Sequence, residues 1–289
     1  MLDDKVILFL FLDVILIFVA LIYMGKLSTL LLKPCLLIDL QQSILDGNFI
    51  IMYQPIVSTT NGHKKNIYGL EALIRWNHPK IGLIMPDEFI PLVEKNNLMD
   101  RLTDILLQKT LNDLKNNDIF NLDKTQNISI NIPPSYLLKS INIKKLVLYR
   151  DNLIKLNWQP CIEITEREKI SEQVIISIHY LRKIGFKFSI DDFGSGCTAL
   201  YLLQEVPFDH LKIDKRFIEK VKNDNDVNHI ITTIIDLSKK LDIKPIVEGV
   251  ENRQQVEYLK GNGCEIYQGY YFYKPLNIKT AINEIIKNK

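Results

Sequence analysis

Short apolar runs in this 289-residue chain end repeatedly in an acidic or amide residue. The residues that end these runs are Glu71, Asn131, Glu163, Asp191 with Asp192, Asp214 and Glu248. A carboxylate costs several kcal/mol to bury unless it is paired or bound to a cation. Carboxylates repeated at the tips of apolar strands are therefore typical of a site that holds metal ions.

The same pattern predicts that strands alternate with helices. Strands are expected at residues 49–57, 67–76, 128–132, 186–190, 244–247 and 264–267, and helices at 86–95, 98–115, 174–184, 228–241 and 252–260. Gly185 is a suitable residue to follow the helix that ends at residue 184. This alternation over about 250 residues predicts an α/β fold, a (β/α)₈ TIM-like barrel with its active site at the carboxyl ends of the strands. Asn61-Gly62 between the first two strands is a hairpin signal, so an antiparallel first strand is expected.

Charge and cysteine content narrow the class of protein. The formal net charge is +2 and 24% of the residues are charged, which favours an ordinary globular protein and argues against a nucleic-acid polymer as partner. The four cysteines show no paired spacing. Cys161 and Cys264 lie inside apolar runs, so both are expected to be small core residues in a reducing compartment.

Residues 6–24 form an apolar segment that is long enough to cross a bilayer. Fifteen of these 19 residues are Leu, Ile, Phe or Val, which favour insertion by about 4.5–9 kcal/mol, whereas Asp13 costs about 3 kcal/mol. A signal peptide fits less well because residues 1–5 are not basic, and a buried globular helix would need a polar face. We therefore expect a transmembrane anchor at residues 1–25, a connector at 26–37 and a catalytic domain at 38–289.

The candidate ligands share one kind of chemistry. Glu71, Asn131, Glu163, Asp191, Asp192 and Glu248 all offer hard oxygen atoms, and neither His nor Cys is among them. Such a set suits Mg²⁺ or Mn²⁺ rather than zinc. The adjacent pair Asp191-Asp192 could bridge or flank two ions, and two-metal sites polarise a phosphodiester and activate water.

Eight ordered blocks resemble the EAL family of cyclic di-GMP phosphodiesterases, over residues 38–286. The blocks are Tyr53-Gln54-Pro55-Ile56-Val57, Glu71-Ala72-Leu73-Ile74-Arg75-Trp76, Pro86-Asp87-Glu88-Phe89-Ile90, Glu163-Ile164-Thr165-Glu166, Asp191-Asp192-Phe193-Gly194, Leu211-Lys212-Ile213-Asp214, Val247-Glu248-Gly249-Val250-Glu251 and Tyr267-Gln268-Gly269-Tyr270. The resemblance implies hydrolysis of cyclic di-GMP to linear pGpG with two Mg²⁺ or Mn²⁺ ions. It places Glu71, Asn131, Glu163 and Asp191 around one ion, and Asp191, Asp192 and Glu248 around the other.

The resemblance also implies roles for residues outside the ligand set. Glu71, Lys212 and Glu166 are expected to be catalytic, and Leu73, Arg75, Asp214, Glu251 and Gln268 to contact the substrate or its neighbours. Lys212 would orient or deprotonate the attacking water, and we favour orientation because deprotonation needs a depressed lysine pKa. Arg75 could clamp a phosphate. Glu166 would tether the loop that follows Asp192.

Three positions depart from the family pattern or need a separate interpretation. Pro133 stands where the family often has a hydroxyl residue, so a hydrogen bond from that hydroxyl is missing. Cys197 stands where an aromatic residue or His is usual, which bears on the rigidity of the loop and on communication in a dimer. His78 fits a family turn and is expected to be structural rather than a ligand.

The residues from Trp158 to Arg167, with Leu102-Thr103, resemble the subgroup that carries a periplasmic sensor between two membrane helices. We expect residues 6–24 to match the second of those helices without the sensor, in the bacterial inner membrane, with the barrel in the cytoplasm. The family also allows a homodimer through the barrel. Two alternatives stay open, namely a non-catalytic receptor of cyclic di-GMP or of a protein, and a metal-dependent phosphodiesterase with another substrate.

Overall fold

The computed structural model describes residues 36–59, 65–117, 125–165, 170–194, 199–219, 221 and 229–288. Its strands are β1 (Phe49–Ser58), β2 (Asn66–His78), β3 (Gly82–Ile84), β4 (Gln126–Asn131), β5 (Trp158–Thr165), β6 (Lys187–Phe193), β7 (His210–Ile213), β8 (Lys244–Val247) and β9 (Ile266–Tyr267). They pair in the order β1-β9-β8-β7-β6-β5-β4-β2-β3, and β1 also pairs with β2. The pairing of β1 with β2 closes eight strands into a barrel, as the sequence predicts.

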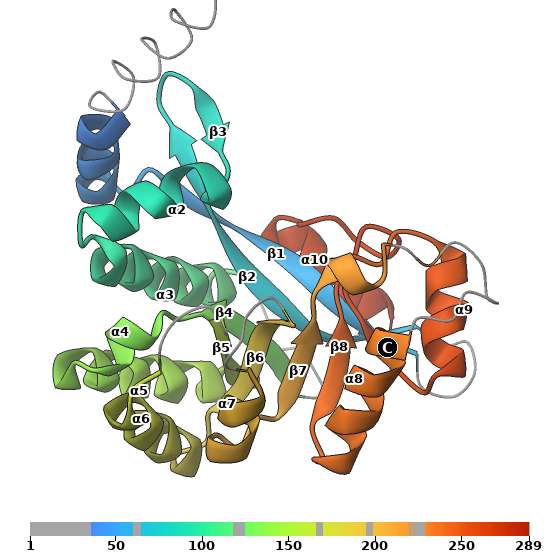
Figure 1. Ribbon diagram of the computed structural model, residues 1–289. Coiled ribbons are helices and arrows are strands. Elements are labelled where there is room, and N and C mark those ends of the chain that lie inside the picture. The colour runs from blue at the N-terminus through green and yellow to red at the C-terminus, as the bar shows by residue number, and fades with distance from the viewer. Residues whose placement is uncertain are drawn as a thin grey trace, which may run out of the picture.

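The first strand runs against its neighbours. β1 is antiparallel both to β2 and to β9, whereas β2, β4, β5, β6, β7, β8 and β9 pair in parallel around the rest of the barrel. The expected antiparallel first strand is thus confirmed. β3 folds back on the end of β2 as a hairpin that projects from the barrel (Figure 1).

Helices cover the outside of the barrel (Figure 1). They are α2 (Pro86–Lys95), α3 (Met99–Lys115), α4 (Pro134–Leu137), α5 (Ser140–Lys155), α6 (Glu172–Lys183), α7 (Ala199–Glu205), α8 (His229–Lys240), α9 (Arg253–Gly261) and α10 (Ile278–Lys287), with a short 3₁₀ turn η2 (Lys215–Phe217) and an N-terminal helix at residues 36–46. Gly185 follows α6 with φ +105°, so the predicted helix end is confirmed. The sequence interpretation did not identify β3, α4, α5 or α10.

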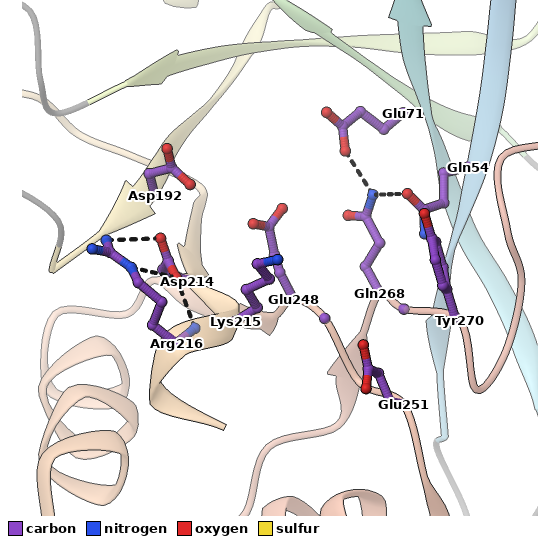
Figure 2. A pocket seen from close by; sticks show the side chains of 12 residues that line it. Gln54, Glu71, Asp192, Asp214, Lys215, Arg216, Glu248, Glu251, Gln268 and Tyr270 are labelled. Atoms are coloured by element: carbon purple, nitrogen blue, oxygen red, sulfur yellow. Dashed lines mark hydrogen bonds and ion pairs between the residues drawn. The ribbon is translucent and has the colours of Figure 1, made fainter. Parts of the chain in front are cut away.

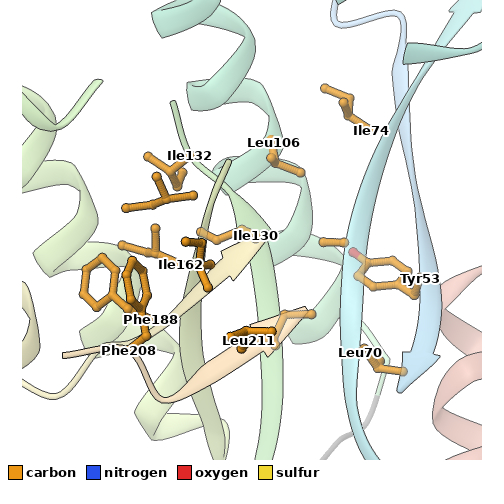
Figure 3. Close-up of a cluster of buried hydrophobic side chains, with 14 of the residues drawn as sticks. Tyr53, Leu70, Ile74, Leu106, Ile130, Ile132, Ile162, Phe188, Phe208 and Leu211 are labelled. Atoms are coloured by element: carbon orange, nitrogen blue, oxygen red, sulfur yellow. The ribbon is translucent and has the colours of Figure 1, made fainter. Parts of the chain in front are cut away.

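The main hydrophobic core lies between the outer faces of the strands and the helices. Figure 3 shows Ile130, Ile162, Phe188 and Leu211 in this layer, and all four are fully buried. Because side chains alternate along a strand, the residues between these apolar positions point into the barrel. Cys161, next to Ile162 on β5, accordingly lies 3.7 Å from His210 Nδ1 of the non-adjacent strand β7.

Two further expectations concern the cysteines and the membrane segment. Cys161 and Cys264 are buried free thiols, as predicted for core residues. No helix within the described ranges is both long and apolar enough to span a bilayer, and the apolar segment at residues 6–24 lies outside those ranges. Cys197 also lies outside them.

Candidate active site

The six predicted metal ligands meet at the carboxyl-terminal mouth of the barrel. Glu71 lies on β2, Asn131 on β4, Glu163 on β5, Asp191 and Asp192 on β6, and Glu248 directly after β8. Asn131 Nδ2 donates to Glu71 Oε1 at 3.0 Å, which joins two neighbouring strands at this mouth. The parallel register of the strands thus brings together residues that are up to 177 positions apart, from 71 to 248.

Asp191 and Asp192 reach the same place although neighbouring side chains of a strand normally point to opposite faces. Asp192 has φ +54°, in the left-handed region that Asp tolerates better than most residues. This backbone turn breaks the alternation at the end of β6. Carboxylate oxygens of Asp191, Asp192 and Glu248 consequently lie within 4.8 Å of one another, close enough to share one cation.

Lys212 lies at the centre of the cluster. Its Nζ is 2.7 Å from Glu163 Oε2, 2.7 Å from Glu248 Oε1, 3.1 Å from Asp191 Oδ1 and 3.2 Å from Glu71 Oε2. The side chain is only 1% exposed. One ammonium group therefore contacts four carboxylates in a volume from which water is largely excluded.

This arrangement shifts several pKa values. Burial alone would lower the pKa of Lys212, but the surrounding carboxylates outweigh burial and raise it well above its usual range. Burial and neighbouring negative charge raise the pKa of Glu163 and of Asp191, and burial raises the pKa of Glu248 to about 8 despite the attraction of Lys212. Only at Glu71 do Lys212 and the hydrogen bonds overcome burial and lower the pKa. If all four carboxylates were ionised, they would carry more negative charge than one lysine can balance.

A cavity of about 550 Å³ opens beside the cluster, and six of the predicted residues line it, Asp192 and Glu248 among them. Glu71, Gln268, Asp214 and Glu251 all line it, and Figure 2 shows Gln268 reaching toward Glu71 across the mouth. Gln268 Nε2 donates to Glu71 Oε2 at 2.6 Å. Asp214 accepts two hydrogen bonds from the Arg216 guanidinium, at 3.0 and 2.9 Å, which fixes both side chains at the rim.

Gly249 allows the floor of this cavity to form. It has φ +65°, and a Cβ atom at this position would lie 2.2 Å from Lys215 Cβ. Only glycine accepts both conditions without moving the backbone. The segment after β8, which carries Glu248 and Glu251, can therefore pass directly against η2, which follows Asp214.

A second cavity, of about 710 Å³, lies on the other side of the cluster between β2 and helices α2 and α3. Leu73, Arg75 and Pro133 line it, together with Asn131, Glu163 and Asp192 from the cluster. Arg75 is largely buried and its Nη1 donates to the Ile74 carbonyl at 2.9 Å. The candidate metal cluster thus stands between two cavities, and all five predicted substrate residues line one or the other.

The sequence interpretation did not assign Gln54, Lys215, Arg216 or Tyr270 to the site, although all four line the first cavity. Gln54 on β1 accepts a hydrogen bond from Gln268 Nε2 at 3.3 Å, and its own Nε2 donates to the Tyr273 carbonyl. A polar residue at this point of the apolar strand 49–57 was the available signal. Tyr270 is exposed on the rim and belongs to the block that contains Gln268. Glu166, predicted to tether a loop, lies outside the described residues.

His78 is the last residue of β2, next to the turn that leads to β3, and it lines neither cavity. Its Nδ1 accepts hydrogen bonds from the backbone N–H groups of Lys80 and Ile81, at 3.1 and 3.2 Å, and its Nε2 is 3.2 Å from Asp39 Oδ2. Both ring nitrogens are therefore engaged in holding the turn. The structural interpretation of His78 agrees with this geometry.

Comparison with known proteins finds relatives that are named as cyclic di-GMP phosphodiesterases. PdeG of Escherichia coli K12, a probable cyclic di-GMP phosphodiesterase, is 34% identical over 249 residues, which cover 86% of this chain and 48% of that protein. The cyclic di-GMP phosphodiesterase NbdA of Pseudomonas aeruginosa is 34% identical over 254 residues, 86% of this chain and 31% of NbdA. The chain thus spans about half the length of PdeG and less than half that of NbdA.

Two solved structures share this fold at 30% sequence identity. The EAL enzyme Bd1971 with cAMP and cyclic di-GMP bound superimposes with a TM-score of 0.79 at 30% identity, covering 98% of this chain and 77% of that one. The PaMucR phosphodiesterase in complex with c-di-GMP gives a TM-score of 0.74 at 30% identity, covering 85% and 99%. The family model of the EAL domain matches residues 38–275. With its barrel, its mouth cluster and this match over most of its length, the chain belongs to the EAL domain family.

Proposed function

We propose that this chain is a metal-dependent phosphodiesterase that hydrolyses cyclic di-GMP to linear pGpG. The observation that carries the proposal is the convergence of all six predicted oxygen ligands and Lys212 at one mouth, between two cavities. Relatives at 30% identity or more that are named for cyclic di-GMP hydrolysis support the choice of substrate. A receptor that only binds the nucleotide would have no need of so many buried carboxylates.

The residues present fit two divalent cations. Every candidate donor is a carboxylate or amide oxygen, the type that Mg²⁺ and Mn²⁺ prefer. Glu163 Oε1 is buried and has no hydrogen-bond donor among the described residues, so it has room for one more positive partner. Glu71, Asn131, Glu163 and Asp191 would hold one ion, and Asp191, Asp192 and Glu248 the other. Bound there, such ions would stabilise charge on the phosphoryl group and make water more acidic.

The remaining side chains position the substrate and the water. Lys212 donates from the centre of the cluster, where it can hold an attacking water in line with a phosphorus atom. Arg75 and Leu73 in the second cavity, and Gln268, Asp214 and Glu251 in the first, would contact the two halves of the nucleotide. The two cavities on either side of the cluster suit a cyclic dinucleotide whose scissile phosphate lies between them.

The test is incubation of the purified full chain with cyclic di-GMP and Mg²⁺, followed by chromatography of the products. We expect pGpG from the wild type and a loss of roughly 10³-fold or more for Glu71→Ala, because a lost ligand removes several kcal/mol of charge stabilisation. Glu265→Ala, at an exposed carboxylate, is the matched control. Tight binding without product would assign the chain to the receptor class. Turnover of another phosphodiester, but not of cyclic di-GMP, would reassign the substrate.

We further propose that residues 6–24 form a single helix through the bacterial inner membrane, with the barrel in the cytoplasm. The support comes from the sequence, since 19 residues with one charge are enough to span the hydrocarbon core. A cytoplasmic barrel would meet a nucleotide made in that compartment.

A further inference from the structure

The hairpin formed by the end of β2 and by β3 exposes an apolar face. Ile81 is 66% exposed, Leu83 52% and Met85 42%, whereas Ile84 between them is buried. Because side chains alternate along an extended segment, Leu83 and Met85 point to one side and Ile84 points to the other, while Ile81 is exposed in the turn just before Gly82. The hairpin thus has one face packed on the protein and one apolar face turned to solvent, here called the hairpin face and defined as Ile81, Leu83 and Met85.

The hairpin is held firmly enough to present this face. Trp76, Asn77 and His78 of β2 pair in register with Ile84, Leu83 and Gly82 of β3. The Nδ1 atom of His78 fixes the turn through the backbone of Lys80 and Ile81. Trp76 and Ile84 are in the core. The exposed side chains consequently stand on a fixed strand pair and not on a mobile loop.

The hairpin face lies at the end of the molecule where the described chain begins. His78 Nε2 is 3.2 Å from Asp39 Oδ2, which ties the hairpin to the helix at residues 36–46. Ile38, next to Asp39, is 65% exposed. Figure 1 shows this helix and the β3 hairpin at the same end of the barrel domain. Only 11 residues, 25–35, separate that helix from the proposed membrane helix, a reach of about 40 Å at most when fully extended.

We propose that the hairpin face and Ile38 dock on the lipid bilayer, with their side chains at the boundary between headgroups and acyl chains. Lys80, exposed at the tip of the hairpin, would meet anionic headgroups. The short tether keeps the face near the bilayer at a high effective concentration, so a small apolar surface suffices for docking. A stable protein dimer needs about 800 Å² from each partner, and these four side chains offer far less.

Docking would set the orientation of the catalytic mouth relative to the membrane. β2 runs without interruption from Asn66 through Glu71 and Arg75 to the hairpin. A hairpin fixed on the bilayer therefore fixes the strand that carries Glu71. This inference rests on the proposed membrane helix but not on the catalytic reaction.

The experiment uses the full chain reconstituted into vesicles of phosphatidylcholine and phosphatidylglycerol, with or without bromine on the acyl chains. One variant is Leu83→Trp on the hairpin face, and its matched control is Leu148→Trp on α5, where the native side chain is 63% exposed. Trp76 and Trp158 are fully buried and give the background emission that the wild type measures. We expect brominated lipid to quench most of the added emission of Leu83→Trp and to leave that of Leu148→Trp unchanged.

The possible outcomes separate docking from the anchor. If the protein floats with the vesicles but Leu83→Trp is not quenched, the anchor stands and docking is overturned. If the protein does not float, both the anchor and the docking are overturned. Equal quenching of the two variants would show general adsorption and overturn the proposed face. An emission shift that depends on the protein-to-lipid ratio, without quenching by bromine, would assign the face to a second copy of the chain and also overturn docking. Product formation from cyclic di-GMP in the same vesicles is read separately.

Discussion

Lys212 supplies the positive charge that offsets part of the negative charge of the candidate site. Four carboxylates within 3.2 Å of its Nζ would repel one another strongly without it, and burial together with the charge of Glu71 still raises the pKa of Glu163 despite the attraction of Lys212. Divalent ions, if bound as proposed, would bring further positive charge to this set of oxygens. The same lysine can then keep a donor role toward water or substrate.

The roles of Lys212 and Arg75 can be separated by kinetics. Lys212→Ala should lower kcat by about 10²–10⁴-fold with a smaller change in KM, because its contact matters mainly in the transition state. Arg75→Ala should chiefly raise KM, because its place in the second cavity points to substrate binding. Steady-state hydrolysis of cyclic di-GMP measures both, with Lys240→Ala at an exposed lysine as control. The reverse pattern would exchange the two roles.

At the proposed metal site, we expect Glu248 to make metal binding depend on pH. Its pKa of about 8 without metal means that the carboxyl group is mostly protonated at pH 7, and a metal must displace that proton to bind. As the pH falls below 8, the dissociation constant for Mn²⁺ should rise by up to about tenfold per pH unit, and above pH 8 it should level off.

Isothermal titration calorimetry with Mn²⁺ at pH 6.5, 7.5 and 8.5 measures this dependence. Glu248→Gln should bind Mn²⁺ more weakly and show a flatter pH profile, because one of the titrating ligands is gone. An affinity for Mn²⁺ that is independent of pH in the wild type would contradict the assignment of Glu248 as a protonated ligand.

At the scale of elements, the contact between β2 and β4 aligns two candidate ligands. Gly69 pairs with Asn127 in the same parallel register that places Glu71 beside Ser129, two residues before Asn131. A Cβ atom on Gly69 would lie 2.8 Å from both the Cβ and the carbonyl oxygen of Asn127. The absence of a side chain at position 69 therefore lets the two strands reach their hydrogen-bonding distance.

Gly69→Ala should destabilise the barrel by about 1–3 kcal/mol, because the added methyl group must push β2 away from β4. For a domain of this size we expect Tm to fall by roughly 2–12 °C, measured by circular dichroism or calorimetry. Gly261→Ala is the matched control, since nothing lies within 4 Å of its Cβ position and it occupies a helix end. A Tm for Gly69→Ala equal to that of Gly261→Ala would show that the strand contact is not tight.

The helices and strands differ in how easily they can be predicted from the sequence. Strands such as β5 and β6 were predictable because a short, mainly apolar run ends in a carboxylate, and the candidate ligands were predictable for the same reason. α5 was not, because exposed Ile141 and Leu148 interrupt the stripe formed by buried Leu146 and Leu153. Gln54 was missed because its role depends on barrel closure, which brings it to Gln268, 214 positions away along the chain.

At the scale of the whole molecule, the barrel has two functional regions in this proposal. The mouth carries the candidate metal cluster and both cavities, while the β3 hairpin, which continues β2 past the mouth, and the helix at residues 36–46 lie at one edge (Figure 1). Strand β2 belongs to both, since it carries Glu71 and ends in the hairpin. The relation of the barrel to the membrane therefore decides whether the mouth can meet its substrate.

The last prediction concerns that relation. The charges that flank residues 6–24 give a modest signal, because Lys26 and Lys33 follow the segment whereas Lys5 and the α-amino group precede it. The proposed substrate, a cytosolic nucleotide, favours a barrel in the cytoplasm, and the free thiols of Cys161 and Cys264 fit a reducing compartment. A reporter fused after Lys289 should be active if it functions only in the cytoplasm and silent if it requires export. The opposite result would leave the proposed active site without access to cyclic di-GMP, because the barrel and the nucleotide would then lie on opposite sides of the membrane.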